Sequence, residues 1–180
     1  MSHDIAAAAE RRWAFVVGAI IFLIVAMMVF TGLHWASMPP SRVETVDPRT
    51  LHISGEFVEG NLGTSVGTDG KVVVRLIAQQ YSFEPQCLVV PVDTPVTFRA
   101  TSTDVIHGFV IGKTNANVML IPGYVATFTT TFPKAGEQLM PCHEFCGSGH
   151  AAMWARVQAL PRDEFLSRSR AGERMSCVPR

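Results

Sequence analysis

The chain has 180 residues, which is enough for one extramembrane domain and a smaller appendage. Its 15 basic and 15 acidic side chains give a formal net charge of zero, which argues against a nucleic-acid partner or a strongly charged one. Hydrophobic residues make up 48% of the chain, and much of this comes from one stretch near the N-terminus.

The first predicted element is a membrane-spanning helix. No Asp, Glu, Lys or Arg occurs from Trp13 to His34. Counted through Trp35, this stretch would rise about 34 Å as a helix, enough to cross the hydrocarbon core of a bilayer. The two tryptophans bracket it, as in an aromatic belt. We therefore predict a transmembrane helix over residues 13–37.

A cleaved signal peptide is the alternative interpretation of this stretch. Its apolar run is long for a signal peptide, and no clean cleavage site precedes Met38. Charge counting on the two sides is nearly balanced, so the orientation follows from the chemistry of the rest of the chain. We expect a cytoplasmic tail over residues 1–12 and an extracytoplasmic location for residues 41–180.

The extramembrane part begins with a predicted linker and continues with β-structure. Residues 38–70 contain turn-forming residues, including five Gly and the pairs Asp47-Pro48 and Asp69-Gly70, which indicates a linker with room for one short hairpin. Alternating residues then predict strands at 72–77, 96–101, 125–132 and 155–159. With no long helical pattern in competition, this favours an all-β domain, an antiparallel Greek-key β-sandwich over residues 71–162. Residues 163–180 are predicted to form a C-terminal tail.

Five potential ligands of a soft metal ion stand out. Cys142, Cys146, His150 and Met153 lie in CHEFCGSGHAAM, and His107 lies upstream in VIHGF. Thiols, imidazoles and a thioether select copper or zinc over magnesium and calcium. A mononuclear blue-copper site uses one Cys, two His and a weak axial Met. The second Cys would allow two thiolates to bridge two copper ions, so the count predicts a dinuclear electron-transfer centre.

Zinc and a disulfide are the alternatives for this ligand set. The spacing Cys-x3-Cys-x3-His-x2-Met is unlike that of structural zinc loops, and Met is a poor zinc ligand. A Cys142–Cys146 disulfide would leave the other three side chains without a shared role. On the predicted sandwich, residues 142–153 would form a loop between adjacent strands, and His107 would lie at the end of an earlier strand. The site therefore resembles a cupredoxin at the level of fold.

Two segments carry a resemblance to a known family. TSTDVIHGFVIGKTNANVMLIPG and PCHEFCGSGHAAM are similar to subunit II of the haem-copper cytochrome c oxidases, which carries the dinuclear copper A centre. The resemblance spans residues 70–160. A single N-terminal anchor and the TN-x-N run are similar to the B-type members of this family. The resemblance implies a cupredoxin-like copper A domain over residues 71–162.

The resemblance also implies roles for individual residues. Cys142 and Cys146 would bridge the two copper ions, and one His would bind each ion. Glu144 would contribute its backbone carbonyl as an axial ligand, so its side chain is not required. The implied metal ligands are His107, Cys142, the backbone carbonyl of Glu144, Cys146, His150 and Met153.

Other residues have two possible interpretations. Tyr81 and Phe83 stand where the family has an aromatic patch for electron entry. Asp104 could orient His107 through a hydrogen bond, or it could simply form a turn. Cys87 could be a small buried hydrophobic residue, or it could form a disulfide with Cys177.

The resemblance implies an electron-entry subunit of a terminal respiratory oxidase. It would accept electrons from a cytochrome c at the copper centre and pass them to haem in the catalytic subunit I, which reduces oxygen to water. No Cys-x-x-Cys-His motif occurs, and we expect no oxygen-reducing site in this chain. The expected location is a bacterial inner membrane, crossed once, with the N-terminus cytoplasmic and the copper domain periplasmic.

Two other functions remain open from the sequence. The copper A subunit of a nitric oxide reductase would carry the same centre, and the residues that distinguish it would lie in the large subunit. A non-enzymatic, membrane-anchored copper-binding module is the other alternative, although carriers exchange metal through open sites and this ligand set looks closed.

Overall fold

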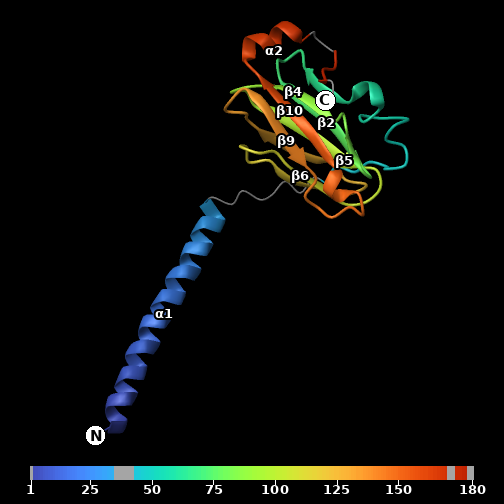
Figure 1. Cartoon of the computed structure of the whole chain (residues 1–180). Coiled ribbons are helices and arrows are strands. Elements are labelled where there is room, and N and C mark those ends of the chain that lie inside the picture. Colours follow the sequence, from blue (N-terminus) through green and yellow to red (C-terminus); the bar gives the residue numbers. More distant parts are fainter. Residues whose placement is uncertain (1, 35–42, 170–172, 178–180) are drawn as a thin grey trace. The chain divides into compact units, whose positions relative to one another are not determined.

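The computed structural model describes residues 2–34, 43–169 and 173–177. The chain divides into two compact units, Met1–Arg42 and Val43–Arg180 (Figure 1). The first is helical and the second is built mainly from strands.

The described part of the N-terminal unit is a helix, α1 (Ser2–His34). Its segment Ile5–His34 is long and apolar enough to cross a membrane, and the side chains of its most apolar stretch are not buried in the protein. The helix begins earlier than the predicted 13–37, because the alanine-rich start of the chain favours helix over an irregular tail. The predicted end, at residues 35–37, lies outside the described residues.

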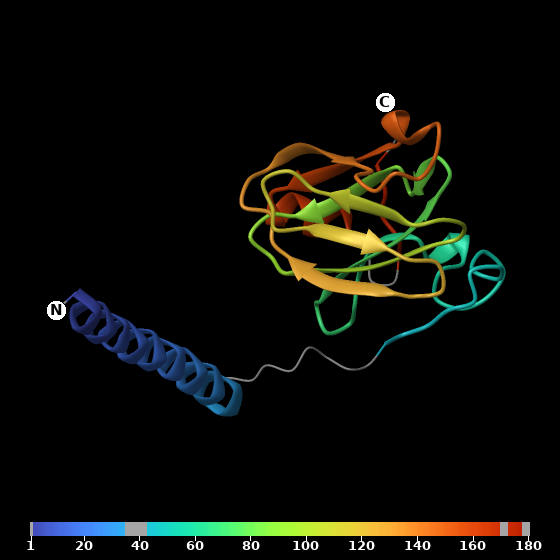
Figure 2. The ribbon, with the colours of Figure 1, turned by 90° about the horizontal axis from the view of Figure 1, so that it is seen from below.

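The second unit is a cupredoxin-like β-sandwich (Figures 1 and 2). Its larger sheet has the strand order β1-β2-β5-β8, with β3 paired to β2, and its smaller sheet has the order β4-β10-β9. Strands β6 and β7 form a separate hairpin. The strands are β1 (Gly63–Val66), β2 (Val72–Gln79), β3 (Ser82–Glu84), β4 (Cys87–Pro91), β5 (Val96–Ser102), β6 (His107–Val110), β7 (Asn117–Leu120), β8 (Ala126–Thr130), β9 (Gly136–Pro141) and β10 (Trp154–Leu160). Short helices are η1 (Glu59–Asn61), η2 (His150–Ala152) and α2 (Arg162–Arg168).

Alternation along the strands places one face of each sheet in the core. Val74 and Phe98 from the larger sheet and Leu88 and Val157 from the smaller sheet are fully buried in one cluster. The ring of Phe98 stacks on Phe128 with centroids 5.1 Å apart. Burying a large apolar side chain stabilises the folded state by about 1.5–3 kcal/mol. Burial of these alternating side chains is therefore the main interaction that holds the two sheets together.

The prediction of a purely antiparallel sandwich was wrong for two strand pairs. Strands β2 and β5 pair in parallel, and so do β4 and β10. A parallel pair requires the chain to cross over between its strands, and here the chain visits the other sheet in between: β4 separates β2 from β5. Alternation in the sequence fixes which face a side chain occupies, but it carries no information about strand direction.

Much of the segment that was expected to be a linker, 38–70, packs on the β domain. Strand β1 pairs with β2, and Leu51, Phe57 and Leu62 form a second buried cluster with Ile77. This cluster covers the face of β2 that points away from the main core. Irregular spacing of the apolar residues hides this packing from a periodicity argument.

An ion-pair network holds the same segment in place. Glu56 accepts hydrogen bonds from Arg75, at 2.8 Å, and from Arg99, at 2.5 Å. Burial raises the pKa of Glu56, but hydrogen bonds from the two arginines outweigh burial and leave the pKa below its ordinary value. Arg99 also pairs with Glu44.

The C-terminal residues form a strap across both sheets. Met175 pairs with Thr64 of β1, and Ser176 pairs with Leu88 of β4. Cys177 forms a disulfide with Cys87, across a sequence separation of 90 residues. Of the two possible roles of Cys87, the structure shows both, because the residue is buried and also disulfide-bonded.

Candidate metal centre

All candidate ligands except His107 lie on one loop, and strand pairing fixes both ends of this loop. Strands β9 and β10 are antiparallel and Pro141 pairs with Trp154, so residues 142–153 leave and return at adjacent positions. The backbone N–H of Cys142 donates to the carbonyl of Met153 at 3.0 Å and closes the base of the loop.

A neighbouring strand brings the remaining ligand to this loop. His107 is the first residue of β6, and Phe109 of the same strand forms a bridge with Cys142. The His107 side chain is completely buried. The loop and the earlier strand therefore meet as the sequence predicted.

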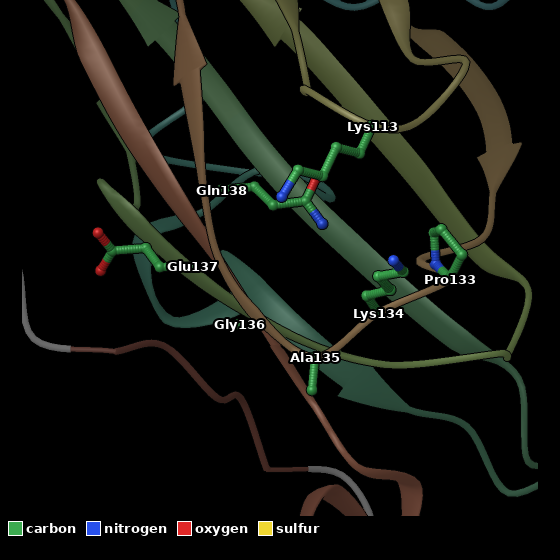
Figure 3. A pocket seen from close by; sticks show the side chains of 7 residues that line it. All are labelled: Lys113, Pro133, Lys134, Ala135, Gly136, Glu137 and Gln138. Atoms are coloured by element: carbon green, nitrogen blue, oxygen red, sulfur yellow. The ribbon is translucent and has the colours of Figure 1, made fainter.

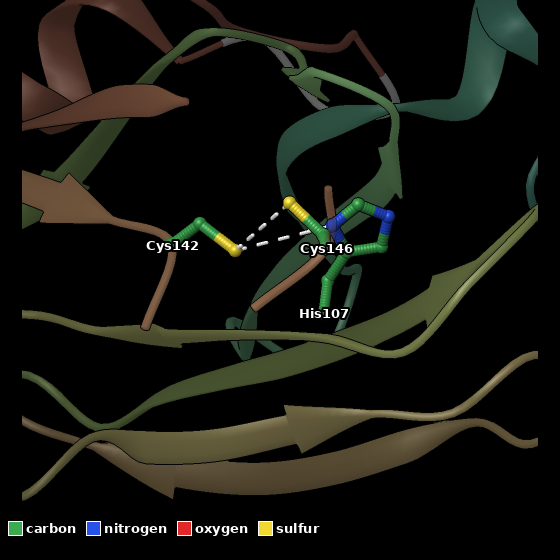
Figure 4. Close-up of side chains that lie close together, drawn as sticks. All are labelled: His107, Cys142 and Cys146. Carbon is green, nitrogen blue, oxygen red and sulfur yellow. Dashed lines mark hydrogen bonds between the residues drawn. The ribbon is translucent and has the colours of Figure 1, made fainter. Parts of the chain in front are cut away.

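The two cysteines lie close together without being bonded. Their Sγ atoms are 3.9 Å apart, and both thiols are free and buried (Figure 4). Cys142 Sγ lies 3.9 Å from His107 Nδ1, and Cys146 Sγ lies 3.6 Å from His150 Nδ1. The structure therefore has no Cys142–Cys146 disulfide. Each thiol lies beside the imidazole nitrogen of a different histidine.

Two weaker donors complete the set. The Met153 Sδ atom lies 3.7 Å from Cys146 Sγ, and its side chain is fully buried. The carbonyl oxygen of Glu144 lies 3.3 Å from Cys142 Sγ. The Glu144 carboxylate points elsewhere, since its Oε1 lies 3.5 Å from His143 Nδ1.

This arrangement fits a metal ion of soft character. Donor atoms of His107, Cys142 and Cys146 all lie within 4.8 Å of one another and could hold a metal ion. This combination of thiol, imidazole and buried thioether donors suits copper better than zinc. Closed zinc sites use Cys and His and have no thioether ligand. The residues present therefore fit a copper centre.

The Cys146 thiol is protonated when no metal is bound. Burial and the nearby Cys142 raise the pKa of Cys146 above its ordinary value. A metal ion must displace this proton because the thiolate is the ligand. Metal uptake should therefore release protons.

Asp104 contacts the His107 ring at Nε2, the nitrogen on the side away from the cysteines. Its Oδ1 lies 2.9 Å from His107 Nε2 and accepts the Val105 N–H at 2.7 Å. The backbone N–H of Gln80 donates to the Oδ2 atom at 2.7 Å. Burial raises the pKa of Asp104, but these hydrogen bonds outweigh it and lower the pKa. Asp104 therefore both contacts the histidine and shapes its turn, with the ring's Nδ1 left facing the sulfur atoms.

Sequence reasoning missed Gln80. Its side-chain Nε2 donates to the carbonyl of Cys146 at 2.6 Å, while its backbone N–H binds Asp104. Gln80 thus joins the His107 segment to the ligand loop. No spacing rule in the sequence indicates this contact, because residue 80 is far from both segments along the chain.

The two predicted aromatic residues occupy different environments. Tyr81 is 39% exposed, and its hydroxyl lies 3.3 Å from Ser148 Oγ. Its ring lies so close to Gly149 that a Cβ there would be 2.5 Å from ring atoms. Phe83 is fully buried in the core. Only Tyr81 of this pair is at the surface beside the loop.

A second exposed aromatic residue, Phe145, was also missed. It lies between the two cysteines, is 81% exposed and places its ring 5.8 Å from the His150 ring. The sequence did offer a sign of this exposed ring, because Phe145 is a large apolar residue that stands between two candidate ligands.

Comparisons with known proteins agree with this geometry. The family described as "Cytochrome C oxidase subunit II, periplasmic domain" matches residues 73–160. Cytochrome c oxidase subunit 2 of Thermus thermophilus is 31% identical over 158 residues, which cover 87% of this chain and 94% of that protein. The Saccharomyces cerevisiae subunit 2 is 37% identical over 79 residues, which cover 44% of this chain and 32% of that protein.

A solved structure agrees as well. A chain from a cryo-EM structure of a heme-copper terminal oxidase dimer superposes with a TM-score of 0.55 and 26% identity. The match covers 84% of this chain and 99% of that chain. With a relative at least 30% identical along most of both sequences, the chain belongs to the cytochrome c oxidase subunit II family, whose members are electron-transfer subunits of respiratory oxidases.

Proposed function

We propose that this chain carries a dinuclear copper A centre and is the electron-entry subunit of a terminal oxidase. It would receive electrons from a cytochrome c and pass them to haem in subunit I, which reduces oxygen to water. The observation that carries the proposal is the pair of free, buried thiols, each beside its own imidazole nitrogen. When bound, two copper ions bridged by these thiolates would supply one-electron transfer.

The proposed ligands divide by their contacts. Cys142 and Cys146 would hold the copper ions through their thiolates, and His107 and His150 would each bind one ion. Met153 and the carbonyl of Glu144, which lie within 3.7 Å of a thiol sulfur, would be additional weak ligands. Their role is to tune the reduction potential rather than to hold the metal.

The chain holds this geometry through a change of redox state. The ligand loop is anchored at its base by strand pairing, and Asp104 and Gln80 fix its contact with the His107 segment. Because strand pairing at the base of the loop and these hydrogen bonds preposition the ligand side chains, little reorganisation would accompany electron transfer.

The donor would dock on the exposed surface around the ligand loop. Phe145 and Tyr81 offer exposed aromatic rings there, beside His150 and Ser148 respectively. Phe83 is buried in the core, so electron entry through its ring is not proposed. Because these two exposed rings are uncharged, we expect the binding of the donor to depend only modestly on salt concentration.

The domain's disulfide supports an extracytoplasmic location. Disulfides such as Cys87–Cys177 persist in oxidising compartments and are rare in the cytosol. With α1 as the one candidate span among the described residues, the N-terminus would be cytoplasmic and the copper domain periplasmic, in a bacterial inner membrane.

The purified oxidase complex provides the test of function. Cys142→Ser and Cys146→Ser should each abolish oxidation of reduced cytochrome c, whereas Glu144→Gln should keep the metal because only its carbonyl is used. Glu144→Gln is therefore also the matched control, because it lies in the same loop and changes a side chain that is not a proposed ligand. Full turnover in either loop variant would rule out the bridging assignment.

A further inference from the structure

The tight turn between β2 and β3 lies against the ligand loop. Gln79 ends β2 and pairs with Ser82, the first residue of β3. Gln80 and Tyr81 are therefore the two residues of the turn. Strand β2 is held on both sides, because β5 pairs with it along almost its whole length and β1 pairs with its first half. The turn is thus a fixed point of the larger sheet, whereas the ligand loop joins two strands of the smaller sheet.

Gln80 holds the ligand loop through its side chain. Its Nε2 atom donates to the carbonyl of Cys146 at 2.6 Å. The backbone N–H of the same residue donates to Asp104 Oδ2 at 2.7 Å, and Asp104 in turn contacts the His107 ring. One residue therefore fixes the position of Cys146 relative to His107, a ligand that comes from a different strand.

Tyr81 covers the part of the loop that follows Cys146. Its hydroxyl lies 3.3 Å from Ser148 Oγ. A Cβ atom added at Gly147 or at Gly149 would lie 2.5 Å from an atom of the Tyr81 side chain. The side chain therefore lies directly against the loop backbone on both sides of Ser148. Together, the two turn residues contact every residue from 146 to 149.

The second histidine of the ligand set depends on this segment for its position. His107 is fully buried and contacts the carboxylate of Asp104. His150 is only half-buried, and among the residues that the structure describes it has no carboxylate partner. Its backbone N–H donates to the carbonyl of Gly147 at 3.1 Å. The position of His150 therefore follows that of the segment that Tyr81 covers.

We propose that Gln80 is a positioning residue of the metal centre. Its side-chain amide keeps the Cys146–His150 half of the ligand set at metal-binding distance from the Cys142–His107 half. Because the loop is ordered before the metal arrives, metal binding does not have to supply the free energy of ordering it. The inference rests on the proposed function in one respect, that the loop binds copper.

Two adjacent glutamines allow a matched comparison. Gln80 is exposed, so Gln80→Met removes the hydrogen-bond donor without opening the core. Gln79 is the preceding residue, and its Nε2 donates to Glu84 Oε1 at 2.7 Å, on β3 rather than on the ligand loop. Gln79→Met therefore loses an amide hydrogen bond of the same kind while the loop keeps its contact.

The first measurement is thiol alkylation of the full-length, metal-free chain in detergent. Of its four cysteines, only Cys142 and Cys146 are free, and they are 7% and 4% exposed. The cavity drawn in Figure 3 gives no route to them, because residues 113 and 133–138 line it. The rate of reaction with iodoacetamide therefore reports how often the ligand loop opens.

We expect Gln80→Met to react about tenfold faster than the wild type, the effect of one lost hydrogen bond to a backbone carbonyl. Gln79→Met should react at the wild-type rate. The melting temperatures of the two metal-free variants should be equal, which separates positioning of the loop from a general loss of stability. Gln80→Glu has the same size but no donor, and should also react faster; it decides the question if Gln80→Met fails to fold.

The second measurement is copper binding by the same proteins, in competition with a copper chelator. Gln80→Met should bind copper about tenfold more weakly than the wild type, and Gln79→Met should bind it equally well. If the wild type held one copper ion or zinc, the copper A assignment would fail while alkylation still tested Gln80. Alkylation and copper binding that are the same in Gln80→Met as in the wild type, or changed equally in both variants, would overturn the proposal.

Discussion

Removing the Cys87–Cys177 disulfide should destabilise the β domain strongly. The bond spans 90 residues, and chain entropy alone predicts a loss of about 4.6 kcal/mol in the free energy of unfolding for a loop of that length. Without it, the strap would depend on backbone hydrogen bonds such as Met175 N–H to the Thr64 carbonyl, at 2.8 Å. We expect the double variant Cys87→Ala/Cys177→Ala to remain folded, with a frayed C-terminus.

The assay is urea unfolding of the full-length, metal-free chain in detergent, followed by near-UV circular dichroism. With a typical urea dependence for a domain of this size, the predicted loss lowers the midpoint by about 2 M. Ser176→Ala, in the same strap, is the control and should shift the midpoint little. A double variant that unfolds within a few tenths of 1 M of the wild type would refute the reasoning that the strap depends on this bond.

Three further predictions concern single side chains. Asp104→Asn should retain the metal but weaken its binding about 10–100-fold, because the residue orients His107; competition with a copper chelator measures this. Gly149→Ala should lower the melting temperature because its Cβ would overlap the Tyr81 ring, and adding Tyr81→Ala should restore part of the loss if the overlap is the cause. The pKa of Glu56 is lowered on folding, so Glu56→Gln should be less stable than the wild type at pH 7. The difference should shrink as pH falls below 4.5, and a difference independent of pH would contradict the ion-pair assignment.

Local patterns predicted the sandwich and the ligand loop well. Alternation identified four strand segments, because residues on one face of each must reach the core, and β2, β5, β8 and β10 lie where it placed them. The loop at 142–153 followed from the ligand spacing, and the structure places it between β10 and β9, a strand that alternation did not identify. These features depend on neighbours along the chain.

Contacts between distant segments could not be predicted in the same way. The link from Gln80 to Cys146 depends on how two loops meet at the end of the sandwich. The Cys87–Cys177 bond depends on the course of the C-terminal strap, and the packing of Phe57 depends on irregularly spaced apolar residues. Such contacts leave no periodic trace in the sequence.

The copper stoichiometry and spin state of the full-length protein test the central claim most directly. Metal analysis combined with electron paramagnetic resonance should find two copper ions per chain that share one unpaired electron. One copper per chain, bound zinc, or a covalent bond between Cys142 and Cys146 in the purified protein would contradict the account.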